Sequence, residues 1–319
     1  MHRELEIIRT DLHCTTVKIR GRDIGRVMAA AEDALGLGLD VWLSPELWNR
    51  SPDTTVRYLR RAAAAAEEVH IQWPGRVVFS VGTELTLFMR GIVAGGTSGK
   101  RVQALREVRS TGAHNAPLNA FLTRAAVAVR EVFNGPVTYA ALPFEQVDWE
   151  MFDIIGLNHY WREPVKDRYL PTLESLLGTG KPVVISEFGF LTRTDADEIG
   201  SWAPLNIDPV TMSLHLLPLT RRLVRPRVKT IHKRAEGLQA RCLLDQLALL
   251  DLAGVDGAFV FTFTAPLWPH AEDPKHDLDT DSFSLVKSCL RRQRGTAYPD
   301  MAWEPKEAFR AVASYYGSH

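Results

Sequence analysis

Two glutamates stand near the ends of apolar segments that lie far apart in the chain. Glu84 follows the run VVFSVGT, and Glu187 follows PVVIS. Two carboxyl groups held roughly 5–5.5 Å apart can hydrolyse a glycosidic bond with retention of configuration, one as acid and then base, the other as nucleophile. The acid has to be protonated near neutral pH, which an apolar setting and a neighbouring anion both favour.

The segments around these glutamates predict a repeated strand–helix architecture. Short runs rich in β-branched residues alternate with longer stretches of helical apolar spacing. The near-continuous apolar character of the short runs is typical of parallel strands covered on both faces. The predicted strands are 14–21, 39–47, 76–85, 136–144, 152–161, 181–190 and 255–265, and the predicted helices are 22–36, 51–70, 117–133, 168–178, 235–253 and 304–316.

This alternation predicts an α/β fold of the TIM (β/α)8-type barrel. The 319 residues are sufficient for it, since such a barrel typically needs roughly 250 residues. A closed barrel has eight strands, whereas the sequence indicates one fewer. The missing strand should precede residue 14, where we see only a short polar segment, so either the chain lacks its first strand or that strand comes from elsewhere. The C-terminal strand ends of a barrel surround one mouth, which would bring Glu84 and Glu187 together.

Composition and length indicate one domain without a strong charge. We expect residues 1–319 to form a single domain, with insertions at 89–116 and 191–232. The formal net charge of +0 gives no global field toward nucleic acid or an anionic membrane. Three scattered cysteines fit neither a disulfide framework nor a zinc site. We see no apolar membrane span and no signal-peptide region, and we therefore expect a cytoplasmic protein.

Several motifs resemble clan A of the glycoside hydrolases, the cellulase-like and β-galactosidase-like barrels. The run SEFG around Glu187 is similar to the clan's nucleophile strand, GAFVFTFTAPLW to its eighth strand, and WEPKEAF to its last helix. That clan carries its acid/base on the fourth strand and its nucleophile on the seventh. With the missing strand counted as the first, Glu84 falls on the fourth strand and Glu187 on the seventh. The resemblance covers most of residues 14–316 and implies that Glu84 is the acid/base and Glu187 the nucleophile.

One position departs from the pattern of the clan. The clan usually has Asn directly before the acid/base, where it donates to the sugar 2-hydroxyl, and this chain has Thr83. A threonine hydroxyl also forms hydrogen bonds, but with a shorter reach and another geometry. The whole chain is in addition similar to actinobacterial proteins that carry the label "abortive infection protein", which implies phage defence.

Two hypotheses of function follow from these features. The first is a retaining β-glycoside hydrolase or transglycosidase of carbohydrate metabolism, which takes a small-molecule glycoside or an oligosaccharide and needs no metal or organic cofactor. The second is a non-catalytic carbohydrate-binding or phage-defence protein on a glycosidase-like barrel. The sugar, the linkage and the oligomeric state do not follow from the sequence.

The resemblance adds candidates for the substrate site. Clan relatives often have an arginine on the strand that carries Lys18 and Arg20, where it steadies the nucleophile; a surface cation is the alternative interpretation. A tyrosine of the clan that hydrogen-bonds the nucleophile corresponds to Tyr160, with His159 as a weaker candidate. Asn158 would contact substrate or satisfy a turn.

Large or acidic side chains near other strand ends are further candidates. Trp268 and Trp161 would stack on a sugar face, with core packing as the alternative. Trp42 would point into the barrel mouth, although core packing is favoured. Glu46 and Glu145 would line the same mouth, or Glu145 would cap the short connection after its strand.

Three motifs resemble ligand sites but lack residues that those sites require. GGTSGK has Ala94 at the first glycine position of a phosphate loop and Arg101 in place of its Ser or Thr. The run 277–282 begins with calcium-loop spacing but lacks the glycine and the final glutamate of that loop. The basic stretch 220–234 has no interleaved aromatic residues, so a solvated insertion face is favoured over a nucleic-acid surface.

Overall fold

A computed structural model describes residues 1–200, 206–220, 223–290 and 293–318. Its internal contacts divide the chain into two compact units. The first unit comprises Met1–His159, Pro171–Glu187 and Val255–Phe259, and the second comprises Tyr160–Leu170, Phe188–Gly254 and Val260–His319. Along the chain, the strands and helices follow the order predicted from the sequence. The single domain expected from the sequence stays a prediction.

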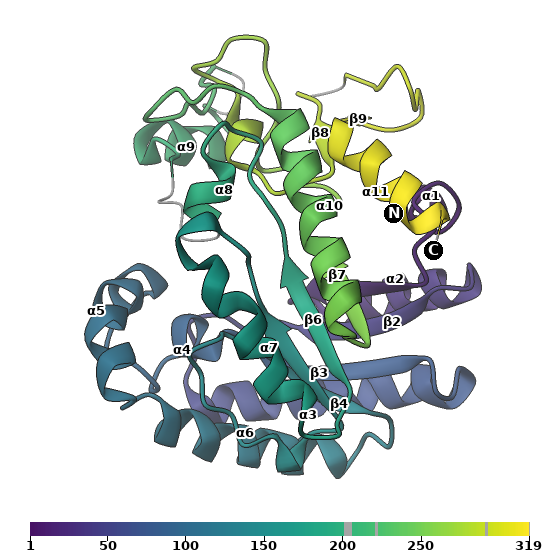
Figure 1. The fold of residues 1–319 in the computed structure, drawn as a ribbon, viewed down its shortest axis with the longest axis vertical. Helices are drawn as coiled ribbons and strands as arrows, with labels where there is room; N and C mark the ends of the chain where they lie inside the picture. The colour runs from purple at the N-terminus through teal and green to yellow at the C-terminus, as the bar shows by residue number, and fades with distance from the viewer. Residues whose placement is uncertain (201–205, 221–222, 291–292, 319) are drawn as a thin grey trace. The chain divides into compact units, whose positions relative to one another are not determined.

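A sheet of seven parallel strands in chain order forms a nearly closed barrel (Figure 1). All but the last residues of β6 and β7 belong to the first unit. Every strand predicted from the sequence is present in a shorter form, which confirms the TIM-type α/β fold. The strands are β1 (Thr16–Gly21), β2 (Asp40–Pro45), β3 (Val77–Thr83), β4 (Val137–Ala141), β5 (Ile154–Asn158), β6 (Val183–Phe188) and β7 (Gly257–Val260).

The opening of the barrel lies between β1 and β7, because these are the two edges of the sheet. In a closed eight-stranded barrel, the first strand lies between the second and the eighth. The opening therefore matches the position of the missing strand. Within the described residues, the segment before residue 14 is not an irregular polar stretch but helix α1 (His2–Thr10), and Leu5 and Ile7 bury its apolar face.

Helices cover the outer face of the sheet in the first unit (Figure 1). Helix α2 packs on β1 and β2, and α3 packs beside α6 and against β3. The alanine-rich face of α3 allows this close approach, since Ala62, Ala63 and Ala66 are fully buried. The helices of the first unit are α1, α2 (Ile24–Gly36), α3 (Pro52–Gln72), α4 (Leu85–Phe88), α5 (Ser98–Thr111), α6 (Asn115–Arg130), the short η1 (Trp149–Met151) and most of α7 (Tyr169–Leu177).

The second unit contains an antiparallel strand pair that the sequence did not predict. Strand β8 (Val286–Ser288) pairs with β9 (Trp303–Pro305). The prediction that the last helix starts at 304 is therefore wrong, because Lys306 is extended and α11 begins only at Glu307. The other helices among the described residues of this unit are η2 (Glu163–Arg168), α8 (Ala196–Ile199), α9 (Pro209–Leu216), α10 (Glu236–Ala253), η4 (Leu278–Asp281) and α11 (Glu307–Gly317).

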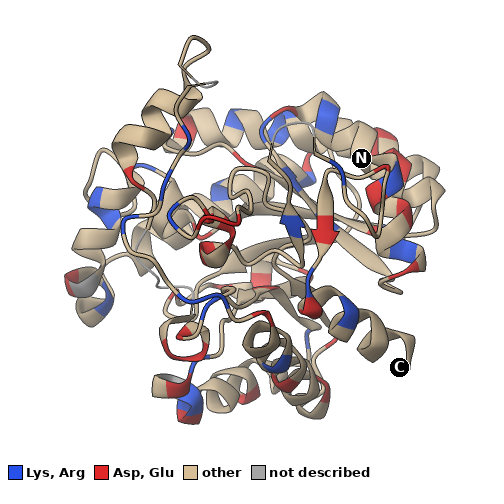
Figure 2. Ribbon diagram, turned by 90° about the horizontal axis from the view of Figure 1, so that it is seen from above, with Lys and Arg blue, Asp and Glu red and all other residues tan. Residues whose placement is uncertain are grey.

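Charged residues of both signs are mixed along the ribbon (Figure 2), as the formal net charge of +0 leads one to expect. Among the helices that the structure describes, none combines the length and the apolar character that a membrane crossing requires. Of the charged residues predicted for the site, Lys18, Arg20 and Glu187 lie on barrel strands and Glu84 directly follows one.

Candidate active site

Glu84 directly follows β3, at the C-terminal end of the barrel strand. Its backbone N–H donates to the Ala140 carbonyl on β4 at 2.9 Å, and its φ of 46° lies in the left-handed region. Such a conformation is unusual for glutamate and needs support from its surroundings. The side chain accepts a hydrogen bond at 2.9 Å from the Asn158 amide, which comes from the end of β5.

A buried tyrosine–glutamate pair fixes the turn after Glu84. The Tyr139 hydroxyl accepts the Leu85 N–H at 2.8 Å and donates to Glu145 at 2.9 Å. Glu145 also accepts the N–H groups of Thr86 at 3.2 Å and Leu142 at 2.8 Å. Glu145 therefore caps the connection after its own strand and the first turn after Glu84.

Glu187 lies on β6 and is held by an arginine from β1. The Arg20 guanidinium donates to one Glu187 oxygen at 2.8 Å and, through Nε, to Glu46 at 2.5 Å. The backbone of Glu187 is also bonded to the residue that follows β5, since its carbonyl accepts the His159 N–H at 3.0 Å. One cation from the first strand thus lies between two carboxylates.

The amide of Asn158 links the Glu84 strand to the Glu187 strand. Its Nδ2 donates to Glu84 and, at 3.1 Å, to the Thr83 hydroxyl. Its Oδ1 accepts the hydroxyl of Ser186, the neighbour of Glu187, at 2.7 Å. Asn158 and Thr83 are both buried. Asn158 therefore connects Glu84, after β3, with Ser186, the residue before Glu187 on β6.

The electrostatic setting separates the two glutamates. Burial, and then the charge of Glu187, raise the pKa of Glu84 to about 8, against the opposing hydrogen bond from Asn158. Within the described residues Glu84 forms no ion pair, whereas Glu187 has Arg20. The raised pKa of Glu84 favours its protonated form, and the Arg20 ion pair favours a charged Glu187, a combination suited to acid-assisted nucleophilic chemistry.

Lys18 is a second cation in this network. Its Nζ donates to the Ser186 carbonyl at 3.1 Å. Burial lowers the pKa of Lys18 to about 8, although the charge of Glu187 opposes the shift. The predicted pair Lys18 and Arg20 thus lies against the Glu187 strand, and the structure does not leave either residue as an isolated surface cation.

The remaining predicted site residues fall into both units. In the first unit, His159 is buried, and Trp42 is buried with its ring 5.1 Å from that of Phe259. In the second unit, Tyr160 packs edge-on against Phe283, Trp161 lies near Phe190, and Trp268 packs on the apolar cluster of Ile207, Val228 and Leu278. Their parts in substrate binding stay predictions.

The rejected motifs have structural roles. Arg101 of the glycine-rich run is fully buried and donates to the backbone of Leu87. In the run 277–282, Asp279 pairs with Lys306 at 2.9 Å. In the basic stretch, Arg227 pairs with Asp208, and residues 221–222 lie outside the described residues.

Sequence reasoning missed the residues that hold the site in place. Tyr139 was not singled out, and neither was Trp48, which follows β2; Arg101 was named only as a residue that departs from the phosphate-loop pattern. A phenol inside an apolar strand and a lone arginine in a glycine-rich run were the available signals, but each identifies a partner only when the fold is known.

Comparison with known proteins supports the fold. The sequence matches no family model and no curated protein. A GH113 β-1,4-mannanase structure covers 99% of this chain and 92% of its own, with 14% identity and a TM-score of 0.62. The GH113 β-mannanase of Alicyclobacillus acidocaldarius covers 99% and 91%, with 15% identity and a TM-score of 0.59.

A β-D-glucuronidase of Dictyoglomus thermophilum is similar over 100% of this chain and 47% of its own, with 13% identity and a TM-score of 0.54. All of these proteins are named as glycoside hydrolases. At such identity the likeness establishes the barrel fold alone, and the activity has to be argued from the site.

Proposed function

We propose that this protein is a retaining β-glycosidase, or a transglycosidase of the same mechanism, with Glu84 as acid/base and Glu187 as nucleophile. The observation that carries the proposal is the contrast between the two carboxyl groups. Glu187 is ion-paired with Arg20, whereas the Glu84 carboxyl, among the described residues, has the neutral amide of Asn158 as its hydrogen-bond partner. The first is suited to remain ionised and the second to hold a proton.

The reaction would proceed in two steps. First, a Glu187 oxygen bonds to the anomeric carbon, the glycosidic C–O bond breaks, and the proton of Glu84 moves to the leaving oxygen. Second, water, or another hydroxyl in transglycosylation, gives a proton to Glu84 and attacks the anomeric carbon, which releases Glu187. Arg20 would orient Glu187 and disperse its charge.

The substrate is proposed as a β-linked pyranoside. The names of the similar structures suggest two classes to test first, β-1,4-linked mannosides and β-glucuronides. Neither class is favoured by a contact in the site. A cytoplasmic location also stays a prediction.

A non-catalytic role is the second candidate. The observation in its favour is Thr83, which replaces the usual asparagine of the clan and whose hydroxyl already accepts a hydrogen bond from Asn158. Such a protein would bind a carbohydrate without cleaving it. The matches described above lend no support to the phage-defence label.

A panel of aryl β-glycosides tests the proposal, with the mannoside, glucoside, galactoside and glucuronide as substrates. We expect turnover of at least one, and its loss in Glu187→Ala. Glu131→Gln is the matched control, since this glutamate pairs with Arg60 on the surface. Turnover that survives in Glu187→Ala would contradict the nucleophile assignment, and binding without turnover would favour the second candidate.

A further inference from the structure

Trp48 is a large aromatic side chain left half exposed beside the site. Trp48 follows β2 and is 54% exposed. The indole stacks on Phe88, with ring centroids 5.0 Å apart and planes 17° from parallel. A near-parallel stack covers one face of the indole and leaves the opposite face for another partner.

Buried polar contacts hold the two loops that carry these rings. The Asn49 N–H donates to the Phe88 carbonyl at 2.7 Å. The fully buried Arg101 donates to the Asn49 side chain at 3.0 Å, to the Leu87 carbonyl at 2.6 Å and to the Gly95 carbonyl at 2.8 Å. Because burial of a guanidinium is costly unless its donors are satisfied, this arrangement fixes both loops. The stacked rings are therefore preorganised before any ligand arrives.

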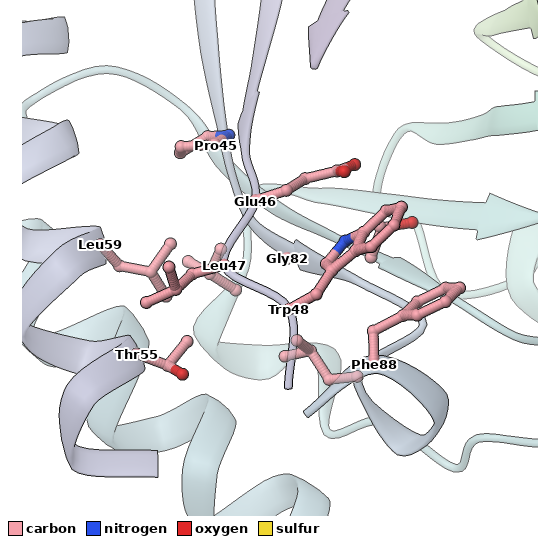
Figure 3. Close-up of a pocket in the computed structure, with 11 residues that line it drawn as sticks. Pro45, Glu46, Leu47, Trp48, Thr55, Leu59, Gly82 and Phe88 are labelled. Carbon is pink, nitrogen blue, oxygen red and sulfur yellow. The ribbon is translucent and has the colours of Figure 1, made fainter. Parts of the chain in front are cut away.

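The stacked rings border a small pocket that is also lined by two residues in contact with the candidate active site, Glu46 and Thr83. Glu46, Trp48, Thr83 and Phe88 all line it. Figure 3 shows Glu46, Trp48 and Phe88 directed to one side of this pocket, with Leu47, Leu59 and Thr55 on the other. Glu46 also accepts from Arg20, the partner of Glu187. An open aromatic face and a fixed carboxylate thus occur together, next to the residue that precedes Glu84.

We propose that Trp48, supported by Phe88, binds a pyranose ring of an oligosaccharide next to the ring that is cleaved. The apolar C–H face of a pyranose matches an indole face, and a carboxylate accepts hydrogen bonds from sugar hydroxyls. Glu46 would supply that acceptor. The location relative to the cleaved ring rests on the proposed function, whereas binding of the sugar to Trp48 does not.

Calorimetry with β-1,4-mannohexaose and cellohexaose tests the binding directly, with Glu187→Gln as the background so that no turnover occurs. We expect at least one hexasaccharide to bind, and Trp48→Ala to weaken it tenfold or more, with Trp48→Phe in between. Trp73→Ala is the matched control, because Trp73 directly follows α3 and precedes the N-terminal end of β3, whereas Glu84 follows the C-terminal end of that strand. Equal affinity in Trp48→Ala, or no binding of either hexasaccharide, would overturn the proposal.

Kinetics in the otherwise unchanged protein separate this proposal from the proposed function. We expect Trp48→Ala to raise KM for the hexasaccharide tenfold and to leave kcat/KM for an aryl monoglycoside unchanged. Equal losses of kcat/KM on both substrates would overturn the proposed binding of a sugar ring by Trp48. Hexasaccharide binding that depends on Trp48 without any turnover would support this binding and contradict the proposed glycosidase activity.

Discussion

Two buried clusters of charged residues differ in how well their charges are balanced. The glutamate cluster of the first unit has two cations for three carboxyl groups, and the aspartate cluster of the second unit pairs each buried carboxylate with a cation. The glutamate cluster consists of Lys18, Arg20, Glu46, Glu84 and Glu187. The aspartate cluster consists of Arg234, His270, Asp277, Asp279 and Lys306.

The aspartate cluster shows what a balanced network looks like. Asp279 contacts Arg234 at 2.8 Å and Lys306 at 2.9 Å, and Lys306 and Asp279 are fully buried. Although burial opposes it, the His270 hydrogen bond and the Arg234 charge hold the pKa of Asp277 below its usual value. Charges compensated in this way fix one arrangement of the chain, here the extended Lys306 before α11.

The glutamate cluster leaves one acid without a cation. Arg20 is shared by Glu46 and Glu187, so the third carboxyl, Glu84, has the amide of Asn158 as its partner. The pKa values of Glu84 and Asp277 move in opposite directions for this reason: burial dominates at Glu84, and partners dominate at Asp277. An uncompensated buried acid, rather than the number of charges, is thus the feature that makes Glu84 the candidate for proton transfer.

The largest expected effect is the removal of the ionised carboxylate. We expect Glu187→Gln to lower kcat by about 10⁴-fold, or about 5 kcal/mol in activation free energy, with little change in the free energy of unfolding because Arg20 keeps Glu46. Single-turnover kinetics and urea unfolding measure the two quantities. A loss of stability that matches the loss of rate would assign Glu187 to structure.

In the aspartate cluster the order of effects should reverse. Lys306→Met leaves Asp279 buried with one cation fewer, and we expect it to lower the free energy of unfolding by about 3–5 kcal/mol. Adding Asp279→Asn should recover part of this loss. Urea denaturation checks both variants, and a change below about 1 kcal/mol would show that the balanced network is not important for stability.

The pH dependence of stability should also distinguish the clusters. Glu84 has a folded pKa of about 8 against an ordinary value of 4.5, so the folded chain keeps a proton there that the unfolded chain has lost. This contribution is complete below about pH 4.5 and is lost as pH rises toward 8. Glu84→Gln should flatten the dependence of the free energy of unfolding on pH in this range, where the proton on Glu84 contributes a slope on the order of 1.4 kcal/mol per pH unit. Identical slopes in both proteins would contradict the shift.

The smallest expected effect concerns the support of Glu84. Tyr139→Phe removes the acceptor of the Leu85 N–H and one donor to Glu145, and we expect it to destabilise the fold by about 1–3 kcal/mol. The rate should fall about tenfold because the turn that presents Glu84 loosens. Unchanged kinetics in a destabilised protein would show that Tyr139 supports the fold without positioning Glu84.

The sequence predicted the fold and the strands that position Glu84 and Glu187. The spacing of apolar residues and the position of a residue at a strand end are local properties of the chain, so both can be read without the fold. It did not predict β8 and β9 or the start of α11, since Lys306 is extended for a distant partner, Asp279. Likewise, the roles of Asn158 as a link and of Arg101 as a buried anchor depend on loops that meet only in the folded barrel.

The ionisation of Glu84 itself is the property that most directly tests its proposed role as the acid/base. Carbon-13 NMR of glutamate-labelled protein, with Glu84→Gln for assignment, follows each carboxyl group through pH without a substrate. We expect one carboxyl that titrates near pH 8 and is absent from the variant. A spectrum in which the Glu84 carboxyl titrates near the ordinary value of 4.5 would rule out Glu84 as the proton-holding acid.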